Sequence, residues 1–278
     1  MTVNSISTWV QFSNEVRSKG CKLLKNLDDY PNSILITGCQ RSGTTMLSRI
    51  VRESDGIVDY WSGNVDDELE GALILSGHLK WDVPGRYCFQ TTYLNQCFHE
   101  YYQHHDGHKI LWVLRNPYST VYSLLNNWPA RALENTFRDS VRINLRSKDK
   151  WLYKFGGDRL YNNLKKACLL YNWKVSQLFD LVPKLGPAIQ VIEYDDLVIE
   201  KERILPCIYD YVDLPYNPSY AEKIHESSID KKKLLTAEES STIKSICEFV
   251  YFKAKGLVDK GGEINNLSEK SNPFEETG

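Results

Sequence analysis

The segment 33-SILITGCQRSGTTMLSRIV-51 places the strongest constraint on how this 278-residue chain can fold. Residues 33–37 are short, apolar and rich in β-branched side chains, which is typical of a strand covered on both faces. A turn with two glycines follows, and a helix is expected from about Gly43 to Glu53. A strand–turn–helix of this kind directs backbone N–H groups and a helix N-terminus at one point, where a phosphate can bind.

Two further strands are expected. The run 109-KILWVL-114 leads directly into 115-RNPYSTVYS-123, where Pro117 suits the first turn of a helix because its missing N–H has no helical partner to lose. The run 188-AIQVIEY-194 is the third strand. Apolar strands that alternate with helices predict an α/β fold around a central, mainly parallel β-sheet flanked by helices.

The remaining pattern is helical. Apolar spacing predicts an amphipathic leading helix over 6–25 and a longer one over 158–182, and 236-TAEE opens a third with a capping-box pattern. Past about residue 261 the chain is polar and aperiodic. We therefore expect a single domain over 1–260 and a mobile tail over 261–278.

Composition excludes several classes of function. The net charge of −2 and the pI near 6.3 do not indicate a nucleic-acid-binding surface. The seven cysteines form no C-x-x-C pair, so each is expected to be an apolar residue or a free thiol in a reducing compartment. No signal peptide and no bilayer-spanning run is present, which predicts a cytoplasmic protein without a membrane partner; the oligomeric state stays open.

The glycine turn has the G-x-x-x-x-G spacing of a triphosphate loop, but Thr44 stands where such a loop has its lysine, and the positive charge is at Arg41. Triphosphate-cleaving enzymes also carry an acidic residue at the end of a neighbouring strand to hold magnesium. Here that strand ends in Arg115. The pattern favours an anionic nucleotide held by arginines and backbone amides, with no metal required.

Together, GCQRSGTTML and the R-x-P-x-x-x-x-x-S spacing of RNPYSTVYS resemble the sulfotransferases that use 3′-phosphoadenosine 5′-phosphosulfate (PAPS) and release 3′,5′-ADP. The downstream QVIEYDDLV and a C-terminal basic segment followed by a last helix are also similar. The resemblance implies a P-loop NTPase-like sulfotransferase fold over roughly residues 33–256. It assigns the 5′-phosphate and sulfonate side to the loop, namely Arg41, Ser42, Gly43, Thr44 and Thr45.

The same resemblance assigns the 3′-phosphate to Arg115 and Ser123, and places Tyr194 near the adenine. The chain departs from cytosolic members of the family because it lacks their R-K-G-x-x-G stretch near the C-terminus. Lys231, Lys232 and Lys233 are candidates for the missing charge, of which Lys232 and Lys233 are taken as cofactor-binding; a solvated basic turn is the alternative.

Sulfonyl transfer needs a base for the acceptor proton, and Arg41 is expected to stabilise the departing phosphate. The family's K-T-H-L-P stretch resembles SGHL here, which makes His78 the first candidate base, with Lys80 as a catalytic neighbour. A carboxylate within 59–70 is the second candidate. Aromatic and acidic residues of that segment also suit a cationic acceptor, such as an amine or guanidinium natural product; these are Asp59, Trp61, Asp66 and Glu68.

Other interpretations stay open. A metal-dependent small-molecule kinase would turn over ATP with magnesium, and a non-catalytic nucleotide-binding protein would bind without transfer. His104, His105 and His108 lie in a turn that lacks other convincing metal ligands. Residues 128–158 have no clear assignment and are a candidate cover for the acceptor.

Overall fold

A computed structural model describes residues 6–16, 22–94, 97–144, 161–225 and 229–258. One four-stranded parallel sheet has the strand order β2-β1-β3-β4. Its strands are β1 (Ile34–Gly38), β2 (Cys88–Gln90), β3 (Lys109–Leu114) and β4 (Ile189–Glu193). The three predicted strands and the parallel sheet are confirmed. Strand β2 was not predicted, because three residues are too few to show a pattern.

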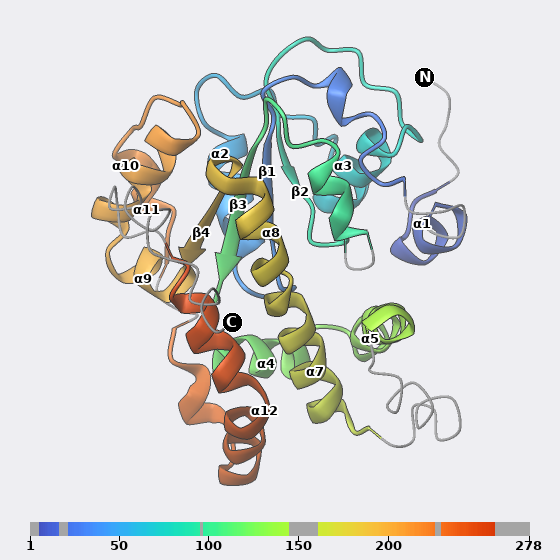
Figure 1. Ribbon diagram of the computed structural model, residues 1–278. Coiled ribbons are helices and arrows are strands. Elements are labelled where there is room, and N and C mark those ends of the chain that lie inside the picture. The colour runs from blue at the N-terminus through green and yellow to red at the C-terminus, as the bar shows by residue number, and fades with distance from the viewer. Residues whose placement is uncertain (1–5, 17–21, 95–96, 145–160, 226–228, 259–278) are drawn as a thin grey trace, which may run out of the picture.

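Helices cover both faces of the sheet, so the chain is a three-layer α/β domain (Figure 1). Along β3, Ile110 and Trp112 enter one core and Leu111 and Val113 the other, as the alternation of side chains on a strand requires. The first core packs against α3 (Asp67–Leu75), α7 (Asn163–Ser176), α8 (Leu178–Leu185) and α12 (Ala237–Lys255). The second packs against α2 (Thr44–Arg52), α9 (Tyr194–Ile199), α10 (Lys201–Tyr211) and α11 (Ser219–Glu222).

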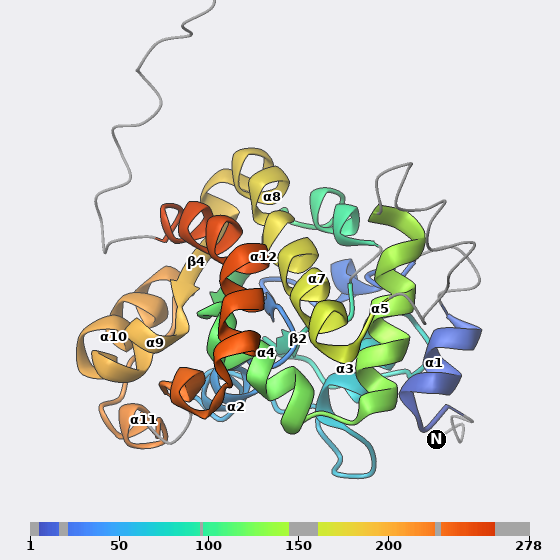
Figure 2. The ribbon, with the colours of Figure 1, turned by 90° about the horizontal axis from the view of Figure 1, so that it is seen from below.

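The carboxyl ends of the strands define the edge where a ligand is expected. The arrowheads of β3 and β4 point toward α4 (Pro117–Asn126) and α12 (Figure 1). In both views α5 (Ala130–Asn144) lies between α7 and α1 (Trp9–Glu15) (Figure 2). From β1 the chain runs to β2 on one side of it, and from β2 it crosses back to β3 on the other side of β1. Such a switch point is where open parallel sheets bind ligands.

Several predicted helices need correction. The leading helix is shorter than 6–25, since α1 ends at Glu15 and residues 22–25 are not helical. The helix over 158–182 divides at Gln177 into α7 and α8. The apolar run 73–75, just before His78, belongs to α3. A continuous apolar run is compatible with either a buried strand or a buried helix.

The other helical predictions are confirmed. Helix α2 follows the loop, α4 begins at Pro117, and α12 opens with a capping box in which the Thr236 side chain accepts from the Glu239 N–H. Residues 128–158 include α5, and the predicted tail over 261–278 lies outside the described residues. Short 3₁₀ helices complete the described chain: Leu27–Asp29, Phe98–Tyr102, Gly186–Ala188 and Lys231–Leu234.

The cysteines are not all free. Cys39, Cys88, Cys168, Cys207 and Cys247 are free thiols, but Cys97 is disulfide-bonded. The expectation of a free or apolar cysteine is therefore wrong at Cys97, and a disulfide is not what a reducing compartment favours. In the described ranges, every helix is too short or too polar to cross a bilayer.

Candidate functional site

The backbone of the turn between β1 and α2 leaves the N–H groups at the start of α2 accessible. Arg41 and Gly43 both lie in the left-handed region, with φ of 69° and 103°. Gly43 caps α2 without a side-chain acceptor. A Cβ at Gly43 would come within 2.1 Å of the Tyr194 ring, so only glycine fits there. The N–H groups of the first turn of α2 are thereby left for an external anion, as in phosphate-binding loops.

Two arginines from neighbouring strands meet at this turn. Arg41 Nε donates to Ser123 Oγ at 3.1 Å, and Arg115 Nη1 donates to the Arg41 carbonyl oxygen at 3.1 Å. The Arg115 guanidinium lies 4.5 Å from the centre of the Tyr194 ring. Burial lowers the pKa of Arg115, but guanidinium groups remain charged in proteins. The loop motif and the R-x-P-x-x-x-x-x-S motif therefore form one cluster, as expected from the sequence.

A cavity of about 750 Å³ opens beside this cluster. Its lining residues come from the turn between β1 and α2, from the end of β3 and from α9, and also from α1, α3 and α5. Ser42 does not line it, since its hydroxyl is buried next to Gly38. The predicted site residues that line the cavity are Arg41, Gly43, Thr44, Thr45, Asp66, Glu68, Arg115, Ser123 and Tyr194.

Glu68 is the carboxylate that the fold brings next to the loop. Its Oε1 accepts from Thr92 Oγ1 at 2.5 Å, and its Oε2 accepts from Gln90 Nε2 at 2.9 Å. Gln90 Nε2 also lies 3.2 Å and 3.3 Å from the hydroxyls of Thr44 and Thr45. Burial raises the pKa of Glu68 to about 7, because desolvation disfavours the carboxylate more than its hydrogen bonds favour it. This is the pKa range suited to a general base at neutral pH.

His78 and Lys80 do not line the cavity. His78 is exposed in the turn after α3, where its Nδ1 lies 3.2 Å from Ser76 Oγ. The Lys80 side chain is 82% exposed and pairs with Asp82 at 2.8 Å. The adjacent Trp81 carbonyl accepts from Tyr30, which precedes β1, so this segment lies toward the amino ends of the strands. The structure does not bring His78 or Lys80 to the arginine cluster.

Of the three consecutive lysines, the first reaches the cavity. Lys231 lines it, and its pKa is lowered by burial and by the charges of Arg115 and Arg41. Lys232 instead lies 4.3 Å from the centre of the Tyr118 ring, and Lys233 is 72% exposed near Asp230. Lys231 therefore lies at the cavity, whereas Lys232 and Lys233, which were expected to bind the cofactor, do not line it.

The acidic segment before α3 is divided between two roles. Asp66 caps α3 by accepting from the Leu69 N–H and also lines the cavity. Asp59 pairs with Arg52 at 3.1 Å, and Arg52 lies 5.3 Å from the centre of the Trp61 ring. Asp59 and Trp61 therefore lie against Arg52 and do not line the cavity, whereas Asp66 and Glu68 do.

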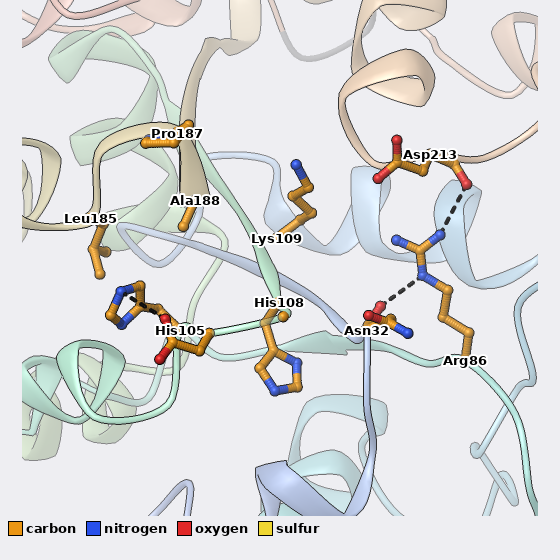
Figure 3. A pocket seen from close by; sticks show the side chains of 11 residues that line it. Asn32, Arg86, His105, His108, Lys109, Leu185, Pro187, Ala188 and Asp213 are labelled. Atoms are coloured by element: carbon orange, nitrogen blue, oxygen red, sulfur yellow. Dashed lines mark hydrogen bonds and ion pairs between the residues drawn. The ribbon is translucent and has the colours of Figure 1, made fainter.

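A second cavity of about 700 Å³ lies at the opposite edge of the sheet, where β3 begins (Figure 3). The Arg86 guanidinium points across it but is already bonded to backbone carbonyls of Asn32, Val212 and Asp213. His105 lies 3.4 Å from Asp106, and Lys109 stacks on Tyr211. No group of three or more possible metal ligands occurs in the part of the chain that the structure describes.

Several cavity residues were missed from the sequence. Gln90 is the last residue of the unpredicted strand β2 and Thr92 follows that strand, so no motif pointed to them. The predicted helix over 6–25 does contribute, through Trp9 and Val10 of α1. Residues Trp128 and Arg131 line the wall next to α5, within the segment that was a candidate cover for the acceptor.

Solved structures of sulfotransferases share this architecture. Mouse sulfotransferase SULT7A1 complexed with PAP matches with a TM-score of 0.51 at 15% identity, over 85% of this chain and 94% of that one. The sulfotransferase domain from the curacin biosynthetic pathway matches with 0.44 at 14% identity, over 83% and 92%. Sulfotransferase STF9 from Mycobacterium avium matches with 0.45 at 11% identity, over 85% and 79%. No family model and no curated protein matches the sequence. The match to SULT7A1 shows that this chain has the sulfotransferase fold.

Proposed function

We propose that this protein is a PAPS-dependent sulfotransferase that modifies a hydroxyl group or an amine or guanidine nitrogen of a small molecule. One observation carries the proposal: Arg41, Arg115 and Ser123, from two motifs 74 to 82 residues apart, meet within 3.1 Å at the N-terminus of α2. The cluster offers two permanent cations and backbone N–H groups to one doubly phosphorylated nucleotide. In this proposal the arginines and the backbone N–H groups neutralise the phosphate charges.

The nucleotide roles follow from position. Arg115 and Ser123 would hold the 3′-phosphate, because a guanidinium forms paired bonds with phosphate oxygens. Gly43, Thr44 and Thr45 would hold the 5′ side through the start of α2. Tyr194 packs on Gly43 and Arg115, where an adenine could stack beside it. Lys231 would supply the charge that the absent R-K-G-x-x-G stretch provides in cytosolic relatives.

PAPS supplies an activated sulfonate group when bound. An acceptor oxygen or nitrogen forms a bond to its sulfur, and the bond from sulfur to the 5′-phosphate oxygen breaks. Glu68 takes the proton of the acceptor. Gln90 Nε2 donates both to the Glu68 carboxylate and to the hydroxyls of Thr44 and Thr45, so the carboxylate lies close to the 5′ side of the nucleotide. Arg41 and the amides of α2 stabilise the charge that develops on the departing phosphate.

The acceptor would occupy the part of the cavity between α1 and α5. Trp9, Tyr93 and Trp128 provide apolar surface there. Asp66 and Glu68 suit a cationic acceptor, but Arg131 and Arg138 line the same cavity, so its charge does not select a cation alone. A natural-product acceptor and a cytoplasmic location stay predictions from the sequence.

The test combines binding and turnover. Thermal-shift measurements with 3′,5′-ADP, ADP and ATP should show stabilisation by 3′,5′-ADP above the others, because a ligand of the folded form raises its stability. Labelled PAPS with a panel of neutral phenols, alcohols, amines and guanidines should then yield a labelled product. Stabilisation by ATP and magnesium with ATP turnover would favour the small-molecule kinase instead. Binding of 3′,5′-ADP without transfer to any acceptor would favour a non-catalytic nucleotide-binding protein.

A further inference from the structure

A lysine is buried behind the proposed base. Lys174 lies on α7 with only 1% of its surface exposed, and its Nζ donates to the Thr92 carbonyl oxygen at 2.7 Å. Burial of an ammonium group is costly and is uncommon for lysine unless hydrogen bonds or charges compensate it. A packing role alone would be served by an apolar side chain at lower cost.

The Thr92 residue connects Lys174 to the reaction centre. Its hydroxyl donates to Glu68 Oε1 at 2.5 Å, and its carbonyl oxygen accepts from Gln40 Nε2 at 2.9 Å as well as from Lys174. Gln40 immediately precedes Arg41 in the nucleotide loop. The Thr92 peptide is therefore held between α3, α7 and the loop, so a displacement of Thr92 would move the base relative to the bound nucleotide.

Lys174 also acts on Glu68 through its charge. Burial raises the pKa of Glu68, and the neighbouring Asp66 raises it further, whereas the Thr92 hydrogen bonds and the charge of Lys174 lower it. Tyr93 and Tyr101 also lie near Glu68, and burial keeps both neutral because it raises the pKa of each phenol. Cys39 interacts with Lys174, and burial keeps it a thiol by raising its pKa to about 12. Lys174 is thus a buried cation that favours the ionised state of Glu68.

We propose that Lys174 is a positioning residue for the transfer reaction, which locks the Thr92 peptide between Glu68 and the nucleotide loop and supplies the buried charge that favours the Glu68 carboxylate. This inference rests on the proposed function, because it takes Glu68 as the base. Its electrostatic part can be tested without turnover, in the protein alone.

The experiment titrates Glu68 by ¹³C NMR of labelled glutamate carboxyl groups, with Glu68→Gln used to assign the signal. Lys174→Gln removes the charge but keeps an N–H donor, and Lys174→Met removes both. In both variants the Glu68 midpoint should rise by at least about one pH unit, because a unit charge at an effective dielectric constant of about 20 contributes about 1.4 kcal/mol even at a separation of ~12 Å. The acid limb of kcat/KM should move by the same amount.

A lysine on the same helix provides the control. Lys166 is 5% exposed and pairs with Glu134 at 2.5 Å, and its contacts lie toward α5 rather than Thr92. Lys166→Met should leave the Glu68 midpoint unchanged. At pH values where Glu68 is ionised, Lys174→Met should lower kcat about tenfold. Lys174→Gln should lower it less, because the glutamine side-chain amide can still donate to the Thr92 carbonyl oxygen.

An unchanged Glu68 midpoint in Lys174→Gln would overturn the proposal, and so would a failure of both Lys174 variants to fold, which would show a structural role only. The proposed function can fail independently. In that case the midpoint shifts as expected while no acceptor is sulfonated.

Discussion

Replacing Glu68 with glutamine removes the proposed base with almost no change in shape. Turnover should fall by roughly 10²–10⁴, the usual contribution of a general base, while affinity for 3′,5′-ADP should stay within about twofold. The wild-type kcat/KM should fall tenfold per pH unit below about pH 7, the pKa to which burial raises this carboxyl. The residual rate of Glu68→Gln should lack that acid limb.

Stability provides a second readout. Burial raises the pKa of Glu68 from 4.5 to about 7, so below about pH 4.5 the carboxyl is protonated in both the folded and the unfolded chain. Between those values the folded chain binds the extra proton, and the wild type loses stability as the pH rises. By pH 8 the loss is about 3 kcal/mol, because each pH unit between the two values contributes about 1.4 kcal/mol. The variant, which cannot ionise there, should then melt about 5 °C higher than the wild type, and at nearly the same temperature at pH 4.5.

A matched control lies one half-turn away. Glu70 is also buried on α3, but its carboxylate accepts from Ser62 and does not line the cavity. Glu70→Gln should retain turnover. More than a tenth of the wild-type rate in Glu68→Gln would show that another group takes the proton. A difference in melting temperature that does not change between pH 4.5 and 8 would show that Glu68 ionises like an exposed carboxyl.

Three further substitutions test the rest of the site. Arg115→Ala should weaken 3′,5′-ADP binding about 10–100-fold in calorimetry but weaken 5′-AMP much less, and an equal loss for both would show that Arg115 does not hold the 3′-phosphate. Gly43→Ala should reduce 3′,5′-ADP affinity more than tenfold, since the added Cβ meets the Tyr194 ring at 2.1 Å; Gly63→Ala, with open space around it, is the control, and normal binding by Gly43→Ala would contradict the loop geometry. His78→Ala should keep turnover within about twofold in the labelled-PAPS assay, because His78 is outside the cavity; a hundredfold loss would restore it as the base.

Local sequence was sufficient to predict several elements of the fold. The strand before Gly38, the start of α4 at Pro117 and the capping box at Thr236 each depend on residues close together in the chain. Short-range backbone preferences determine such elements, so they can be predicted directly. The convergence of Arg41 and Arg115 was predictable too, because both follow parallel strands at the same edge of one sheet.

The proposed base, Glu68, could not be identified from local sequence. His78 and Glu68 are ten residues apart, and their order in the chain does not say which end of the sheet each faces. That choice depends on the 67–75 segment being helix α3 instead of a strand, and on β2 being only three residues long. An apolar run is compatible with both structures, so packing against the sheet decided between them.

The amino-acid sequence by itself determined the α/β fold, the phosphate-type turn and the two arginines that follow neighbouring strands, because each of these is encoded within a few consecutive residues. Only the tertiary structure decided which carboxylate lies at the turn, which lysine reaches the cavity and what surrounds them. Burial, charge and distance depend on contacts between segments far apart in the chain, such as the contact of Thr92 with Glu68 and Lys174.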